Sequence, residues 1–194
     1  MRKNAKFDRD QVVDKATNLY WEKGFHATSM RNLQDVIDMR PGSIYATFGS
    51  KEGLFKEALI RYTEQSLALL QACRRDAASP IEGLKRFIKK IVIDSQTNAP
   101  NGMCMLAKTV AELGDENAEL LAQAKQSLQR LEGEFEVLIA DAQAIQEVAD
   151  TKSAHELARH IQIQISGLRV YAKTHGPEAP LDSLIDDLFL HYPF

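Results

Sequence analysis

The chain is 194 residues long, 44% of its residues are hydrophobic, and its formal net charge is −3. This length and apolar content are those of a folded protein with one large or two small domains, so they exclude a disordered chain. The slightly negative charge excludes a protein that coats nucleic acid with its whole surface, and no run of about 18 apolar residues could span a membrane.

The charge is unevenly divided along the chain. Residues 1–62 contain 11 Lys and Arg against 8 Asp and Glu, whereas residues 63–194 contain 13 against 19. A positive first part favours contact of that part alone with an anion, although chance unevenness of surface charge would give the same difference. The two cysteines, Cys73 and Cys104, have no metal-ligand spacing, and the first ten residues lack the apolar stretch of a signal peptide. We therefore expect a cytoplasmic protein without a bound metal or cofactor.

Apolar residues recur with the helical period in nearly every segment, and none alternates steadily as in a strand, which predicts an all-α fold. The first helix is expected at about 9–23, capped by Asp8 and ended by Gly24. Its apolar stripe consists of Val12, Val13, Ala16, Leu19 and Tyr20. A second helix is expected after Thr28 or Ser29. Its inward face consists of Met30, Leu33, Val36 and Ile37.

Helix starts and stops continue along the chain. A short third helix is expected at about 42–48, and Ser50 caps a fourth that begins at Lys51. Pro80 and Pro180 each suit a first helical turn, so two further helices begin there. Between these two lie a loop at 98–103 and helices at about 103–113, 115–144 and 151–174.

The stretch at residues 29–55 reads SMRNLQDVIDMRPGSIYATFGSKEGLF and predicts a helix-turn-helix. A helix that enters the major groove needs small residues on its exposed face, and the third helix carries Gly42, Ser43, Ala46 and Thr47. Ile44 and Phe48 lie four apart and are expected to turn inward. Tyr45 and Lys51 are expected to face outward, where a phenol and an ammonium group reach phosphate oxygens.

These residues resemble the DNA-binding region of TetR-family transcriptional regulators, and the resemblance covers residues 8–60. It implies a DNA-binding head at 1–50, made of the first three helices, and a connecting helix with an effector-binding and dimerisation domain at 51–194. It also implies DNA contact at Pro41, Gly42, Ser43, Tyr45 and Lys51, with Arg31 where some members read a base. The complete expected DNA-binding set is Thr28, Arg31, Arg40, Pro41, Gly42, Ser43, Tyr45, Ala46, Thr47 and Lys51.

One departure from the family pattern lies in the turn before the third helix. Asp38 stands where family members usually have a glycine. Asp tolerates the left-handed backbone conformation better than most residues, so the turn is still expected to form.

The segment at 155–176 is apolar on more than one side, which indicates burial on more than one side. Either it lies centrally in the monomer or it packs on a partner. The resemblance favours a homodimer held by this helix and the last one. The expected interface residues are Leu157, Ile161, Ile165, Leu168, Ala172, Leu184 and Leu188. A second apolar set on the same helix is Ile163, Val170 and Tyr171.

The same segment begins HELARH, which is close to the zinc motif H-E-x-x-H. His155 and His160 are five residues apart and do not share a helix face, so no metal site is expected.

The expected effector pocket is centred on the helix that begins near residue 103. Cys104 lies at the helix start with Lys108 one turn on, and both features would favour a thiolate. By resemblance to one branch of the family, Cys104 is a candidate sensor of electrophiles or oxidants. The alternative is a buried cysteine that acts as a small hydrophobe. The expected pocket residues are Phe87, Ile91, Met103, Cys104, Met105, Lys108, Val110 and Phe135.

Three functions follow from these features. The first is a homodimeric repressor on a palindromic double-stranded DNA operator, released by a small ligand or by cysteine modification. The second is a DNA-binding protein without an effector, in which the second half only dimerises. The third is a helical enzyme or carrier, for which the sequence offers no nucleophile–base pair, phosphate loop or metal cluster.

Overall fold

The computed structural model describes residues 8–190 of the chain. Within that range the protein contains ten α-helices and no strand, so the predicted all-α fold is confirmed. The helices are α1 (Arg9–Lys23), α2 (Met30–Ile37), α3 (Pro41–Phe48), α4 (Lys51–Arg75), α5 (Pro80–Lys89), α6 (Ser95–Asn98), α7 (Met105–Glu112), α8 (Ala118–Ala144), α9 (Ala154–His175) and α10 (Leu181–Asp187).

The predicted boundaries of the first helices are confirmed. The Asp8 carboxylate accepts hydrogen bonds from the first backbone N–H groups of α1, and α1 ends at Gly24 with φ 90°. Asp38 takes the left-handed conformation (φ 54°, ψ 45°), so the turn forms without the usual glycine. Ser50 caps α4 by accepting from the N–H of Gly53.

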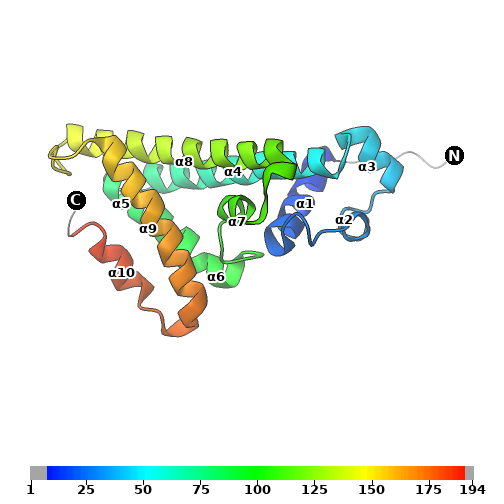
Figure 1. Cartoon of the computed structure of the whole chain (residues 1–194). Coiled ribbons are helices and arrows are strands. Elements are labelled where there is room, and N and C mark those ends of the chain that lie inside the picture. The colour runs from blue at the N-terminus through cyan, green and yellow to red at the C-terminus, as the bar shows by residue number, and fades with distance from the viewer. Residues whose placement is uncertain (1–7, 191–194) are drawn as a thin grey trace.

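Two long helices, α4 and α8, lie side by side and connect the two ends of the molecule (Figure 1). The first three helices pack at one end of α4, and α9 and α10 lie toward the other end. With 25 residues, α4 is roughly 37 Å long, since an α-helix rises 1.5 Å per residue. It is therefore long enough to extend from the head to the far end of the body.

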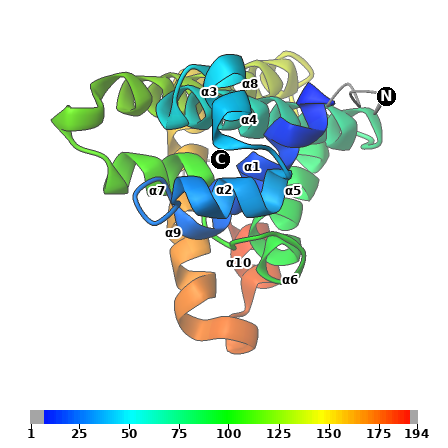
Figure 2. The same cartoon turned by 90° about the vertical axis from the view of Figure 1, so that its right-hand side faces the viewer.

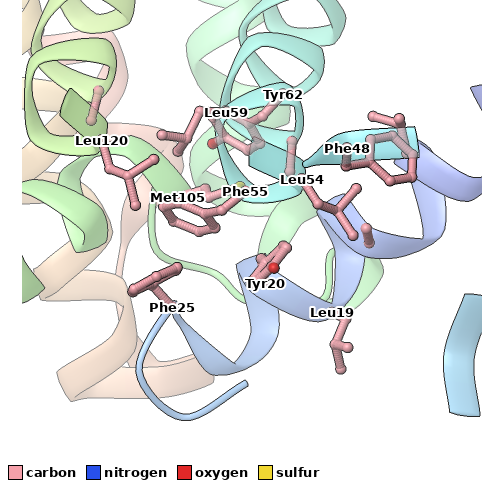
Figure 3. Packing of buried hydrophobic residues seen from close by; sticks show 14 of the residues in the cluster. Leu19, Tyr20, Phe25, Phe48, Leu54, Phe55, Leu59, Tyr62, Met105 and Leu120 are labelled. Carbon is pink, nitrogen blue, oxygen red and sulfur yellow. The ribbon is translucent and has the colours of Figure 1, made fainter. Parts of the chain in front are cut away.

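One of the two hydrophobic cores crosses from the head into the body (Figure 3). In it, the ring of Tyr20 on α1 meets Phe55 on α4 edge-on with centroids 4.7 Å apart, and Phe25 lies 5.0 Å from Phe55. Met105 of α7 and Leu120 of α8 belong to the same cluster. The second core is built from the far part of α4 together with α5, α8, α9 and α10.

The second core contradicts most of the expected dimer interface. Five of the seven residues named for that interface are buried in the monomer's own core: Leu157, Ile161, Ile165, Leu168 and Ala172. Leu184 and Leu188 of α10 are partly buried against the same core. The exposed apolar residues of α9 are instead Ile163, Val170 and Tyr171, which lie on the opposite side of the helix. On α2, Val36 was also expected inside, but it is 39% exposed.

The segment after α5 was predicted only as helix. It continues through one π-helical turn, Lys90–Asp94, directly into α6. Such turns are rare and occur frequently at functional sites. None of the helices in residues 8–190 is long and apolar enough to cross a membrane.

Candidate nucleic-acid interface and ligand cavity

Helix α3 is fixed to the head by two buried side chains. Its ribbon lies at the head end of the molecule, which faces the viewer in Figure 2. Ile44 has no exposed surface and Phe48 is 7% exposed, as predicted. Tyr45 is half exposed. The other expected contact residues with exposed surface are Arg31, Arg40, Pro41, Gly42, Ser43 and Ala46, whereas Thr47 is half-buried. The structure therefore brings most of the expected DNA-binding set together on one accessible surface.

Two glycines near this surface have opposite surroundings. A Cβ added to Gly42 would meet no described atom within 4 Å, so the fold itself does not require a glycine there. A Cβ added to Gly53, at the start of α4, would lie 2.0 Å from the backbone oxygen of Phe48. Gly53 is thus needed for the close approach of α3 and α4, whereas a Cβ at Gly42 would lie in open space.

Two residues of the expected DNA-binding set differ from expectation. Thr28 is completely buried, and its hydroxyl donates to the Gly24 carbonyl at 2.6 Å, so a direct contact with DNA is wrong for this residue. Lys51 is half-buried rather than outward-facing, with Nζ 4.2 Å from the centre of the Phe25 ring. Partial burial lowers the pKa of Lys51, although Glu52 and Glu112 act in the other direction.

Side-chain hydrogen bonds join α7 to the end of α1 and the turn that follows it. We call this set of contacts the α7–α1 clasp. Lys108 Nζ donates to the carbonyl oxygens of Trp21 at 2.8 Å and Glu22 at 3.1 Å. The Glu112 carboxylate accepts from the backbone N–H groups of Phe25 at 3.1 Å and His26 at 2.7 Å. Trp21 Nε1 donates in return to the Met103 carbonyl at 2.6 Å. The clasp therefore joins the body directly to the head.

A cavity lies beside the clasp and has two parts. The outer hollow has a volume of about 710 Å³, and its wall includes Asn18 and Trp21 of α1 together with the π-helical turn. The inner recess is smaller, about 40 Å³. Its apolar wall comes mainly from α5 and α8, and α9 adds Gln162, Ser166 and Arg169 beside Ile165. Four residues line both parts: Tyr62, Ser66, Ile91 and Arg169.

Arg169 of α9 is the charged residue at the junction of the two parts. It is only 3% exposed, and its Nη1 donates to the Tyr62 hydroxyl at 3.4 Å, a long hydrogen bond. Its Nε is buried without a hydrogen-bond partner. Burial raises the pKa of Tyr62, as does the Cys104 thiol beside it, while Arg169 acts in the other direction. Among the described residues no carboxylate pairs with Arg169, and an uncompensated buried charge is unfavourable.

Half of the expected effector residues lie at this cavity. Phe87, Ile91, Cys104 and Phe135 come together in the inner recess. The other four are wrong, because their side chains have other surroundings. Lys108 belongs to the α7–α1 clasp, Met105 and Val110 pack in or against the first core, and Met103, whose carbonyl accepts from Trp21, lines neither part of the cavity.

Sequence reasoning missed Tyr62, Trp21 and Arg169 as cavity residues. Arg169 did carry a signal, because it lies four residues after Ile165 and three before Ala172, on the buried side of α9. A charged residue at a core position within an apolar stripe is rare without a partner or a function.

Residues 12–58 match the family model of bacterial regulatory proteins of the tetR family, and residues 80–188 match that of the tetracyclin repressor-like C-terminal domain. The chain belongs to the TetR family. Members of this family are transcriptional regulators rather than enzymes, and they act as dimers with small-molecule effectors. The resemblance found in the sequence is thereby confirmed over both halves of the chain.

Individual TetR-family proteins align with half of the chain to nearly all of it. The HTH-type transcriptional repressor ComR of Escherichia coli (strain K12) is 25% identical over 86% of this chain and 80% of its own. The repressor BdcR of the same strain is 30% identical over 54% of this chain and 53% of its own. A solved cysteine mutant of the regulator CifR, in complex with a 26-base-pair double-strand operator DNA, is 26% identical, with a TM-score of 0.85 over 97% of this chain and 98% of that one.

Proposed function

We propose that this TetR-family chain is a cytoplasmic, homodimeric repressor that binds a palindromic operator through α3 and is released by a small ligand in the cavity. The observation that carries the proposal is the composition of the cavity wall, which contains Asn18 and Trp21 of α1 as well as residues of the body. A ligand in the hollow would touch head and body together. The division into a DNA-binding head at 1–50 and an effector and dimerisation domain at 51–194 is part of this proposal.

The exposed face of α9 supports a dimer. Ile163 is 68% exposed, Val170 49% and Tyr171 37%, and these residues follow one another at helical spacing. Gly167 lies between them with open space around its Cβ position, so a partner helix could approach closely. Contiguous exposed apolar residues mark interaction surfaces. Leu184 and Leu188 of α10, which were named for the interface from the sequence, keep part of their surface exposed beside the second core.

Release requires that the ligand favours a head position that does not fit the operator. Trp21 connects the cavity with the α7–α1 clasp. Its ring meets that of Tyr62 edge-on with centroids 4.9 Å apart, and its backbone oxygen accepts from Lys108. A ligand that displaces Trp21 or Tyr62 would shift the end of α1 together with α7. Only the difference in ligand affinity between the two head positions drives the change.

Two features of the sequence favour a thiolate at Cys104, its place at a helix start and the nearby Lys108, and the structure supports the first of them. Cys104 forms the N-cap of α7 and lines the inner recess. Lys108, however, points to the end of α1 and does not face the thiol. Titrating operator binding with a maleimide distinguishes the readings. A sensor role requires release of the native protein and of Cys73→Ser, and resistance of Cys104→Ser. Equal release of Cys104→Ser would leave a non-covalent ligand as the effector.

The test of the proposed function is selection of DNA from a random duplex library, followed by titration of the selected duplex with a panel of small molecules. We expect a palindromic sequence and at least one compound that lowers operator affinity. A selected operator with no response to any compound that binds the cavity would favour a DNA-binding protein without an effector. Absence of any preferred sequence would contradict the proposal.

A further inference from the structure

The cavity contains a positive charge that the monomer does not neutralise. Arginine stays protonated at all physiological pH values, so the Arg169 guanidinium carries its charge while it is 3% exposed. Its one hydrogen bond to a described residue is the 3.4 Å contact to Tyr62, whose neutral hydroxyl supplies no counter-charge. A protein that gained nothing from this charge would do better with an apolar residue at the same position.

The unused side of the guanidinium has a defined geometry. Nη1 is taken by Tyr62, and Nε has no partner. The Nε–H bond and the adjacent N–H of Nη2 form the edge of the guanidinium that binds a carboxylate through two parallel hydrogen bonds. The neighbouring Tyr62 hydroxyl accepts from Arg169, and its own proton, which now faces the weakly accepting Cys104 thiol, can be donated to a bound acceptor instead. These donors are arranged for an acceptor group with a negative charge.

Other charges around the cavity do not compensate for Arg169. Lys90 and Asp94 lie at the outer wall, are each about half exposed, and face one another at 4.0 Å. They neutralise each other at the mouth, so the net charge that remains along the described wall is that of Arg169. An anion that enters the hollow would therefore be drawn past the mouth toward α9.

The rest of the wall is mixed, with polar side chains such as Gln65, Thr97 and Asn98 and with apolar side chains that fit hydrocarbon. Trp21, Leu69 and Pro100 contribute apolar surface to the outer hollow, and Phe87, Leu131 and Phe135 line the inner recess beyond Arg169. A volume of about 710 Å³ is in the range of sites for small organic ligands. An inorganic anion would leave this apolar surface uncovered.

We propose that the cavity binds a small organic acid, whose carboxylate pairs with Arg169 and the Tyr62 hydroxyl and whose hydrocarbon part lies against Trp21. The inference rests on the proposed function only in naming this acid as the effector. The site itself is a property of the monomer. Because Trp21 belongs to the α7–α1 clasp, the bound acid would contact the residue that joins the head to the body.

Matched pairs of acids and amides test the site by calorimetry on the full chain, in chloride-free buffer and without DNA. The probes are benzoate with benzamide, 3-phenylpropanoate with 3-phenylpropanamide, and hexanoate with hexanamide. We expect at least one acid to bind at least tenfold more tightly than its amide. Arg169→Gln should abolish that preference, because the affinity for the acid should fall while the affinity for the amide stays unchanged. Lys90→Gln is the matched control, since it removes the cation at the mouth, and it should keep the preference.

A second variant gives a readout that needs no ligand. Arg169→Met replaces the unpaired charge by an apolar side chain of similar length, so its melting temperature without ligand should equal or exceed that of the native protein. A large fall in melting temperature would show that the guanidinium is already compensated within the fold and would overturn the inference. The same conclusion follows if none of the three acids binds at 10 mM, if amides bind as well as acids, or if phosphate alone binds as tightly as the acids.

The outcomes separate the site from the proposed function. An acid that binds through Arg169 but leaves operator affinity unchanged confirms the site and contradicts its role in release. A protein that selects no operator contradicts the proposed function, while the calorimetric result on Arg169 stands by itself.

Discussion

At the scale of single residues, Gly42 and Gly53 separate the needs of the fold from those of DNA binding. Gly42→Ala places a methyl group in open space, so the free energy of unfolding should stay equal or rise by about 1 kcal/mol. The same methyl would stand between α3 and the groove, and operator affinity should fall by about tenfold. Chemical denaturation and fluorescence anisotropy measure the two effects.

Gly53→Ala is the matched control for Gly42→Ala. Its added carbon would overlap the Phe48 carbonyl oxygen, and overpacking of this kind costs roughly 1–3 kcal/mol. A Gly42→Ala protein that binds the operator normally would show that α3 does not enter the groove at this residue.

Lys51 gives a second prediction at this scale. Its ammonium group lies over Phe25 and is half-buried, yet it borders the surface that contains Tyr45. Lys51→Gln removes the charge and keeps only the first part of the aliphatic stem. If Lys51 binds a phosphate, the slope of log affinity against log salt should fall by about one, with the operator sequence preference unchanged. An unchanged slope would assign Lys51 to packing on Phe25 alone.

The residues that could be predicted from the sequence are those whose role depends on local pattern. Ile44 and Phe48 follow from spacing on one short helix, and both are buried. The spacing within α9 marks Arg169 as a core position, but its contact with Tyr62 joins residues far apart in the chain, so the cavity around it could not be read from the sequence. Thr28 was assigned to DNA by resemblance alone, and the Gly24 carbonyl takes its hydroxyl.

At the scale of helices, α9 has one face in the core and one face open. Ile163→Glu places a charge on the open face and should give a folded monomer with weak operator binding. Sedimentation and circular dichroism measure association and folding. Ile165→Glu, two residues on, is the matched contrast. It buries the charge in the second core and should lower the free energy of unfolding by about 3 kcal/mol or more. A dimeric Ile163→Glu protein would exclude this face as the interface.

The same helix explains why the interface could not be assigned from sequence. The sequence shows that α9 has apolar residues on more than one side, since Ile161 and Ile163 are both apolar. It does not show which side faces the core of the monomer. Which of them meets the monomer depends on where α5 and α8 pack, and that is a tertiary property. Helix starts were easier, because Ser50 and Asp8 act on N–H groups only two or three residues away.

The α7–α1 clasp provides a further prediction at this scale. Lys108→Met together with Glu112→Ala removes its four side-chain hydrogen bonds to α1 and the following turn. Amide exchange at Phe25 and His26 should then accelerate by about tenfold or more, since these N–H groups lose their acceptor. Amides within the middle of α4 should keep their protection. Unchanged exchange at His26 would show that α7 does not hold the head.

At the scale of the whole molecule, the account joins three surfaces. In the proposed function the α3 surface meets DNA, the open face of α9 meets a second copy, and a ligand enters the cavity that has α1 in its wall. The first core extends from α1 through α4 to α7 and α8, so packed side chains connect the cavity residue Tyr62 with the head (Figure 3). A shift of a two-state equilibrium needs only a difference in ligand affinity between the states.

The most direct test of the whole account is the stoichiometry of the protein on its own selected operator, measured by anisotropy with duplex well above the dissociation constant. The account predicts saturation at two chains per palindromic duplex or a multiple of two, and loss of tight binding when one half-site is scrambled. It predicts that Ile163→Glu fails to reach that end point although the protein remains folded. Saturation at one chain per duplex, or equal affinity for the scrambled duplex, would contradict it.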